Sequence, residues 1–307
     1  MRIISITDIE GFKFGHAQNR KAATGCTVII APNAAAAGVD VRGNSPATRE
    51  TDLLKSEKNT EKINAVVLSG GSAYGLDAAG GVMKYLEEKG IGFKVPAGIV
   101  PIVCGASLYD LGFGDASVRP DFEMGYEACK NADGGKMFMQ GSFGAGCGAT
   151  VGKYFGMDHA MKSGIGFYAC QVGDLKVGAI VAVNALGDVY GEDGEKLAGL
   201  LNEDCSDFAD TCDAIINSYS NVNHVFGGNT TLGCIVTNAR LSKLQCNRIA
   251  SSGHDAYARS IRPVHTQDDG DCIFCMASGI VEADSMAVEV LAQKMISKAI
   301  ENAVINA

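Results

Sequence analysis

Apolar runs separated by glycine-rich turns dominate the chain and predict alternating strands and helices. The predicted strands lie at 3–6, 26–30, 39–41, 65–68, 166–172, 176–184, 232–236 and 272–277. Apolar residues at helical spacing predict helices from the 69–77 turn to about 89, and at 121–132, 202–218, 241–258 and 284–304. In the last helix this spacing predicts a core stripe formed by Met286, Val290, Leu291, Met295 and Ile300.

The mixture of strands and helices favours a layered α/β or α+β fold over an all-helical or all-strand one. Antiparallel sheets between two helix layers would suit the pattern, with a hairpin at Gly173-Asp174. The chain has 307 residues, of which 47% are hydrophobic, and this is enough for a large core in one or two domains.

Charge narrows the range of partners. The 26 basic and 35 acidic residues give a net charge of −9, and no basic run stands out. Nucleic acids and anionic membrane surfaces are therefore not expected partners. No apolar run approaches the ~20 residues that span a bilayer. Residues 1–8 lack the apolar core of a signal peptide, so we expect a first strand there and a cytoplasmic protein.

The eleven cysteines are scattered, which is typical of reduced packing residues in a cytoplasmic protein. Cys272 and Cys275 form the only CxxC pair, and strand alternation would place them on opposite faces. A redox role is the lesser alternative. No cofactor or metal is predicted.

Two glycine-rich segments resemble phosphate-binding loops but lack the residues that such motifs require. The segment 69–77 has no GxGxxG, so tight helix packing is preferred there. The segment 141–153 has Cys147 where a phosphate loop needs glycine, and Tyr154 follows Lys153 in place of Ser or Thr. Its glycines would let the backbone approach a substrate, and Lys153 is either the charged lip of that cleft or a surface lysine.

The stretch Gly227-Gly228-Asn229-Thr230-Thr231 places a flexible turn directly before an apolar strand. One interpretation is an ordinary turn and core strand. The other is self-cleavage, in which the Thr230 hydroxyl attacks the Asn229 carbonyl and Thr230 becomes a new N-terminus. Its α-amine, with a reference pKa of about 7.7–8.0, would then suit a base near neutral pH.

Further polar residues follow or interrupt apolar strands. Asn184 closes a strand and is either a turn former or an oxyanion donor. Asp268, Asp269 and Asp271 surround Gly270, and they form a plain turn, bind a metal or orient the proton of a nucleophile. No further acidic pair supports the metal. Asp271 enters a strand, so we expect it to be partly buried with a partner. The polar segment 42–52 is equally a solvated loop or a pin for a site.

Taken together, several motifs resemble those of the DmpA family, which contains L-aminopeptidase/D-esterases and β-aminopeptidases and has nylon-oligomer hydrolases as relatives. The resemblance covers nearly the whole chain. The motifs are TGCTV (24–28), VDVRG (39–43), TRETD (48–52), SGGSAYGLD (69–77), GATVGK (148–153), VAVN (181–184), His265-Thr266 and DGD (269–271).

The resemblance implies an αββα sandwich like that of N-terminal-nucleophile hydrolases, with the style of fold shared by ornithine acetyltransferases. It implies one domain, 1–307, cut at Asn229–Thr230 into pieces 1–229 and 230–307 that stay associated, usually in a homotetramer of such pairs. Thr230, Asp269 and Asp271 match the nylon-hydrolase branch, and Lys153 and Asn184 match the substrate-side and oxyanion-side positions. No residue is assigned as the carboxylate that binds a substrate amine.

The resulting hypothesis is a self-processing aminopeptidase or amidase that acts on short peptides, amino acid amides or esters through an acyl-enzyme on Thr230. The alternatives are an acyltransferase of the ornithine acetyltransferase type and a non-catalytic binding protein on the same fold.

Overall fold

The computed structural model describes residues 1–220 and 228–307. The predicted turn residue Gly227 lies outside these ranges. The strands are β1 (Arg2–Ile3), β2 (Lys13–Asn19), β3 (Thr24–Val41), β4 (Ala47–Arg49), β5 (Lys62–Ser69), β6 (Phe93–Val95), β7 (Gly98–Val100), β8 (Val103–Ser107), β9 (Thr150–Val151), β10 (Met161–Lys162), β11 (Ile165–Val172), β12 (Leu175–Asn184), β13 (Asp188–Tyr190), β14 (Lys196–Ala198), β15 (Thr230–Ala239), β16 (Ile261–Arg262) and β17 (Cys272–Val281). The α-helices are α1 (Ala78–Glu88), α2 (Phe122–Asp133), α3 (Thr211–Asn217), α4 (Lys243–Ser260) and α5 (Ser285–Ile305).

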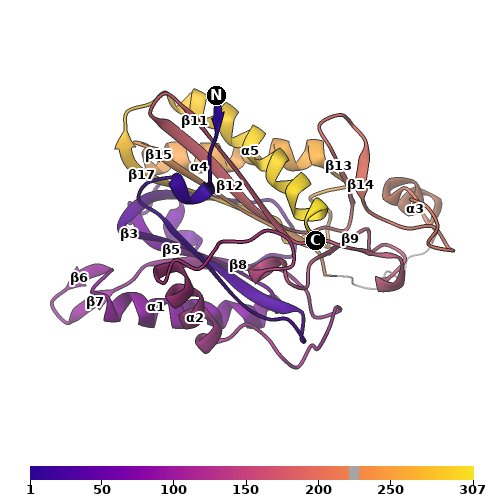
Figure 1. Cartoon of the computed structure of the whole chain (residues 1–307), viewed down its shortest axis with the longest axis horizontal. Coiled ribbons are helices and arrows are strands. Elements are labelled where there is room, and N and C mark those ends of the chain that lie inside the picture. Colours follow the sequence, from indigo (N-terminus) through magenta and orange to yellow (C-terminus); the bar gives the residue numbers. More distant parts are fainter. Residues whose placement is uncertain (221–227) are drawn as a thin grey trace.

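The architecture is an αββα sandwich, as expected, and Figure 1 shows its layers from α5 and α4 at the top to α1 and α2 at the bottom. One sheet layer contains β11, β12, β15 and β17, and the other contains β2, β5 and β8. The long strand β3 belongs to both layers, because it pairs with β17 near its end and with β2 and β5 near its start. The strands predicted at 26–30 and 39–41 are thus two parts of one strand.

The sheet is mixed. Among the described strands, its order is β1-β11-β12-β15-β17-β3-β5-β8-β4, with β2 paired to β3. Most pairs are antiparallel, including the predicted hairpin β11–β12, but β15–β17 and β5–β8 are parallel. The expectation of antiparallel sheets was therefore wrong at these two pairs. The β15–β17 pair places the start of β15 beside the acidic turn that precedes β17.

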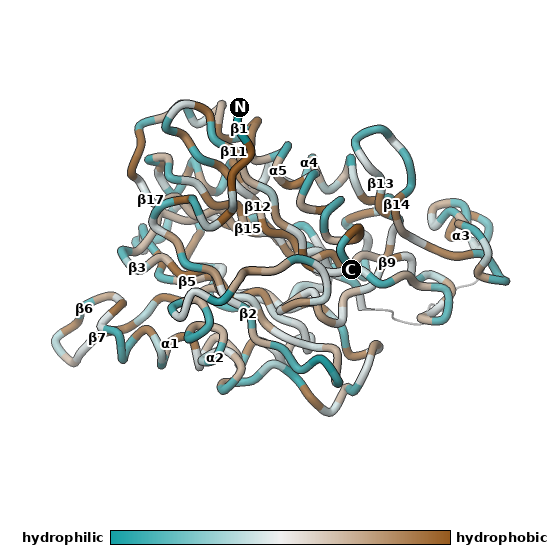
Figure 2. Tube along the Cα trace, viewed as in Figure 1, coloured by the Kyte–Doolittle hydropathy of each residue, from teal (hydrophilic) through white to brown (hydrophobic). Residues whose placement is uncertain are grey.

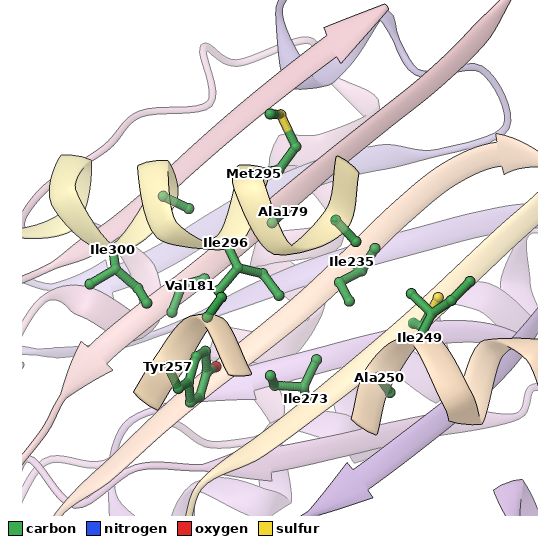
Figure 3. Packing of buried hydrophobic residues seen from close by; sticks show 14 of the residues in the cluster. Ala179, Val181, Ile235, Ile249, Ala250, Tyr257, Ile273, Met295, Ile296 and Ile300 are labelled. Carbon is green, nitrogen blue, oxygen red and sulfur yellow. The ribbon is translucent and has the colours of Figure 1, made fainter. Parts of the chain in front are cut away.

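Among the described residues, three hydrophobic clusters fill the spaces between the layers. The outer cluster joins β12, β15 and β17 to α4 and α5, and Figure 3 shows Ile235, Tyr257, Ile273 and Ile296 within it. The central cluster lies between the sheet layers, and the third packs β3 and β5 against α1 and α2. In Figure 2 the buried strands are largely brown and the outer loops largely teal.

Strand alternation separates the two cysteines of the CxxC pair as predicted. Cys272 belongs to the central cluster and Cys275 to the outer one. All eleven cysteines are free thiols. Within 1–220 and 228–307, none of the helices combines the length and apolar character that crossing a membrane requires.

Two predicted elements differ from the structure. The helix predicted at 202–218 begins only at Thr211, because the Asn202 side chain accepts the backbone N–H groups of Ser206 and Asp207 and holds a turn there. The first strand ends at Ile3, because Ser5 caps a short 3₁₀ helix. In addition, the strand β2 was not predicted.

The predicted core stripe on α5 was only partly confirmed. Met295 and Ile300 are buried, whereas Met286 and Val290 are 66% and 52% exposed. The buried face instead uses small residues, among them Ala292, Ala299 and Ala303. An Ala-rich face lets the helix approach the sheet closely: a Cβ added at Gly166 of β11 would lie 2.0 Å from the Ala299 carbonyl oxygen.

Candidate active site

The start of β15 carries the predicted cleavage bond. Thr230 and Asn229 are 4% and 2% exposed. The Thr230 hydroxyl donates a hydrogen bond to the carbonyl oxygen of Asn229, and the Gly270 N–H donates to the same oxygen at 3.0 Å. The carbonyl group next to the candidate nucleophile is therefore already held by a backbone donor.

Asn184 lies directly opposite Thr230 in the antiparallel β12–β15 ladder. Opposed residues place their side chains on the same face of a sheet. The Asn184 Oδ1 accepts from the Thr150 N–H at 3.1 Å, and its Nδ2 donates to the Tyr109 carbonyl oxygen at 2.8 Å. The structure thus brings Asn184 beside Thr230, the candidate nucleophile, with its amide orientation fixed and its NH₂ group bound to Tyr109.

Lys153 is buried in the site and is not a surface lysine. Its Nζ lies 2.9 Å from both the main-chain oxygen and Oδ1 of Asn184, and 3.5 Å from the carbonyl oxygen of Gly228. Burial lowers the pKa of this amine to about 7, against the opposing effect of Asp269, Asp110 and Asp271. A lysine with this pKa can take up and release a proton near neutral pH.

The glycine-rich loop delivers Lys153 to this position. Gly152 has φ +69°, and a Cβ there would lie 2.0 Å from the backbone nitrogen of Leu200. Only glycine suits both the left-handed conformation and the close approach. At Gly152 the close approach is to the backbone of Gly199 and Leu200, whereas the predicted approach of the loop backbone to a substrate stays a prediction.

In the acidic turn, Asp269 and Asp271 occupy different environments. Asp269 Oδ2 accepts the Thr266 N–H at 2.7 Å, and the residue forms a bridge with Asn229. Burial, together with the nearby Asp271 carboxylate, raises the pKa of Asp269 to about 6. Asp271 is fully buried with several hydrogen-bond donors, and this exceeds the partial burial expected from the sequence.

The start of the polar segment 42–52 binds the acidic turn through its backbone. The segment therefore supports the candidate site and is not simply a solvated loop. The N–H groups of Arg42 and Gly43 donate to the Asp271 carbonyl oxygen at 3.0 and 3.2 Å, and the Ser45 N–H donates to the Asp269 carbonyl oxygen at 2.9 Å. A Cβ at Gly43 would lie 2.3 Å from the Asp269 oxygen.

Among the residues that the structure describes, two cavities adjoin the site. The larger one, of about 270 Å³, is lined by Tyr109, Asp110, Lys153, Tyr154 and other residues. The smaller one, of about 30 Å³, is lined by Tyr109, Asn229, Thr230 and the serines Ser45, Ser72 and Ser107. Tyr109 borders both, and its ring covers Gly228, since a Cβ there would lie 2.2 Å from the ring.

The sequence analysis did not identify Tyr109 and Asp110 as residues of the site. Asp110 is 3% exposed and lines the larger cavity. Its carboxylate accepts the Thr24 hydroxyl and the Gly71 N–H, both at 2.7 Å, and burial raises its pKa. The available signal was the pair Tyr109-Asp110, which follows the apolar run 101–108. The 69–77 turn thus binds the Asp110 carboxylate through the Gly71 N–H. The helix that follows this turn packs tightly on α2, since a Cβ added at Gly81 would lie 1.8 Å from the Phe122 carbonyl oxygen.

A family model, Peptidase family S58, matches residues 5–307. The chain belongs to this peptidase family. An uncharacterized aminopeptidase of Mycobacterium leprae is 39% identical over 303 residues, covering 92% of this chain and 81% of the relative. A 6-aminohexanoate-oligomer endohydrolase of Agromyces is 30% identical over 279 residues, covering 90% of this chain and 75% of the relative.

Solved structures agree with the fold. A Burkholderia β-aminopeptidase superposes with a TM-score of 0.70 at 19% identity, covering 97% of this chain and 85% of the other. The L-aminopeptidase D-Ala-esterase/amidase of Ochrobactrum anthropi, described as a variant of the Ntn-hydrolase fold, also gives 0.70, at 16% identity, covering 99% of this chain and 86% of the other. Family S58 membership and the aminopeptidase relatives identify the S58 chain as a peptide hydrolase.

Proposed function

We propose that the chain cuts itself between Asn229 and Thr230, and that Thr230 then hydrolyses the N-terminal residue from short peptides, amino acid amides or esters. The observation that carries the proposal is the contact of the Thr230 hydroxyl with the carbonyl group of its own preceding residue, while Gly270 donates to that carbonyl. Pieces 1–229 and 230–307 would stay together as one domain, and assembly into a cytoplasmic homotetramer of such pairs is part of the same proposal.

Self-cleavage would begin with a bond between Thr230 Oγ1 and the Asn229 carbonyl carbon. The hydroxyl proton passes to a base, for which the Lys153 amine, with a pKa of about 7, is suited. The Gly270 N–H stabilises the oxyanion. The C–N bond then breaks, the Thr230 nitrogen receives a proton, and water hydrolyses the ester to leave an Asn229 carboxylate.

Turnover would repeat this chemistry on a substrate. Thr230 Oγ1 attacks the substrate carbonyl, the amine leaves with a proton, and water hydrolyses the acyl-enzyme. Asp269, whose pKa is about 6, and the new α-amine carry protons, and Asp271 holds the strand behind the nucleophile. Asn184 and Lys153 flank the oxyanion side.

Asp110 suits the substrate's free amine. Asp110 is the one carboxylate among the described residues that line the larger cavity. Lys153, which carries the opposite charge when protonated, lines the same cavity. An ammonium group would offset the cost of keeping the Asp110 carboxylate buried. A cavity of about 270 Å³ has room for a small amino-acyl group and not for a folded protein chain.

The test starts from intact-mass spectrometry of the purified protein. We expect two masses for residues 1–229 and 230–307, whose sum exceeds the chain mass by one water, with threonine first on the smaller piece. The variant Thr230→Ala should give one uncut chain without amidase activity, and Thr230→Ser should still be cut. A processed, active Thr230→Ala protein would overturn the proposal. An amine acceptor that outcompetes water would instead favour the acyltransferase alternative, and an intact wild-type chain without turnover would favour a binding protein.

A further inference from the structure

Within the part of the chain that the structure describes, Asp271 accepts three hydrogen bonds, and none of them comes from the Thr230 hydroxyl. Its Oδ1 accepts the backbone N–H of Thr231 at 2.6 Å. Its Oδ2 accepts both the backbone N–H and the ring Nδ1 of His265, at 3.1 and 2.8 Å. The carboxylate therefore connects His265 to the residue that directly follows the nucleophile.

The direction of the His265 hydrogen bond follows from the chemistry of its partner. Both oxygens of Asp271 already accept backbone N–H groups, so Nδ1 is taken as the protonated ring nitrogen that donates to Oδ2. The ring is fixed on its other side by α4, with ring centroids 4.7 Å from His254 and 6.1 Å from Tyr257. His265 has φ +57°, in the left-handed region where asparagine, aspartate and histidine are the most common residues after glycine.

The position of Thr230 depends on this arrangement. Thr231 lies opposite Val183 in the β12 ladder, and its N–H is the one that Asp271 binds from the other side. The first residues of β15 are thus held between β12 and the Asp271 carboxylate. A shift of about 1 Å at a reacting group is enough to slow a reaction on the order of 10²-fold.

We infer that His265 is a positioning residue: its Nδ1–H and backbone N–H fix the Asp271 carboxylate, which in turn holds the Thr231 N–H and sets the position of the Thr230 nucleophile. This inference rests on the proposed function. It predicts that the donor at the Nδ1 position is what matters, and that the imidazole ring beyond that donor is dispensable.

A matched pair of variants isolates that donor. Asparagine and aspartate both tolerate the left-handed conformation and have nearly the same size. His265→Asn keeps an N–H donor near the Nδ1 position, whereas His265→Asp places a second carboxylate against Asp271. We expect H265N to retain self-cleavage and kcat within about threefold, and H265D to lose on the order of 10²-fold in both, with KM unchanged. His16→Asn, at a buried histidine far from the site in sequence, measures the general cost of such a change.

A second measurement keeps the inference testable where H265D is not cut at all. In the uncut Thr230→Ala chain, hydrogen exchange of the backbone amides at the start of β15 should be faster with H265D added and unchanged with H265N. Wild-type exchange and kinetics in H265D would overturn the inference, as would equal losses in H265N and H265D. Failure of the proposed function appears separately, as a wild-type chain that stays intact or a Thr230→Ala chain that is active.

Discussion

The side-chain nitrogen of Lys153 lies 2.9 Å from the main-chain oxygen of Asn184 and 2.9 Å from its side-chain oxygen. This contact joins the glycine-rich loop to the end of β12, directly beside the strand that begins with Thr230. Because the amine is buried, its pKa falls to about 7. One residue thus holds the site together and is available for proton transfer.

Replacement of Lys153 by methionine should slow self-cleavage by at least about 10²-fold, the effect of removing a positioned proton carrier. Methionine keeps most of the side-chain length and loses the nitrogen, so the Asn184 oxygens lose a donor. The measurement is the time course of the two fragments on a denaturing gel. Processing of Lys153→Met at the wild-type rate would contradict the role.

The same lysine predicts a dependence of stability on pH. Its folded pKa, about 7, lies below the unfolded value of 10.5, so the unfolded chain binds more protons between these values. The free energy of unfolding should therefore rise with pH across that window. Urea midpoints of the uncut Thr230→Ala chain at pH 7 and pH 9 test this, and adding Lys153→Met should flatten the trend.

Asp269 should set the acid limb of the activity profile. Because its pKa is raised to about 6, protonation below pH 6 removes the base and kcat/KM should fall there. Asp269→Asn should lower activity and abolish this limb, while Asp255→Asn, at an exposed position on α4, should leave the profile unchanged. A limb near pH 6 that persists in Asp269→Asn would assign it to another group.

The Asp269 contribution to the free energy of unfolding depends on pH in the opposite direction to that of Lys153. The folded chain holds the Asp269 proton up to about pH 6 and the unfolded chain only to 3.8, so this contribution to stability is lost as pH rises through that window.

Asp110 should discriminate between substrates with and without a free amine. If its carboxylate binds the ammonium group, Asp110→Asn should raise KM for amino acid amides by about tenfold or more, since a hydrogen bond to a charged group contributes about 1.5–3 kcal/mol. The same substrates with an acetylated amine should show no such difference. Equal KM changes for both substrate sets would indicate that Asp110 supports the fold and does not contact the amine.

Local patterns predicted the elements of this site but not how they meet. The strand ending at Asn184 and the strand after Thr230 were both evident as apolar runs, whereas their pairing in the β12–β15 register is a long-range relationship that periodicity does not encode. Lys153 remained ambiguous for the same reason, because its contacts, Asn184 and Gly228, lie far along the chain. Asp110 carried little signal, since a single carboxylate after a strand is usually a turn residue.

The α5 stripe shows a second limit. Helical spacing identifies an apolar face, but Met286 and Val290 lie on the exposed side while alanines face the sheet. A search for apolar spacing selects positions with large hydrophobic side chains, whereas a helix that packs closely on a sheet has small side chains in the contact.

The contact between Tyr257 and Gly233 provides a test of core packing behind β15. Tyr257 is fully buried, and within 1–220 and 228–307 its hydroxyl has no hydrogen-bond partner. A Cβ added at Gly233 would lie 2.6 Å from that hydroxyl oxygen. Gly233→Ala should therefore destabilise the chain by about 1–3 kcal/mol through overpacking. Tyr257→Phe should be neutral or stabilising, because it removes an unsatisfied buried polar group.

The double variant distinguishes this packing explanation from a general intolerance of β15 to side chains. Removing the hydroxyl opens the space that the new methyl group requires, so Tyr257→Phe should recover most of the stability lost in Gly233→Ala, giving a coupling between the two sites. Urea denaturation of the four chains in the Thr230→Ala background measures it. Additive losses would show that the hydroxyl is not the obstacle, and a Tyr257→Phe chain less stable by 1 kcal/mol or more would show that the hydroxyl has a hydrogen-bond partner in solution.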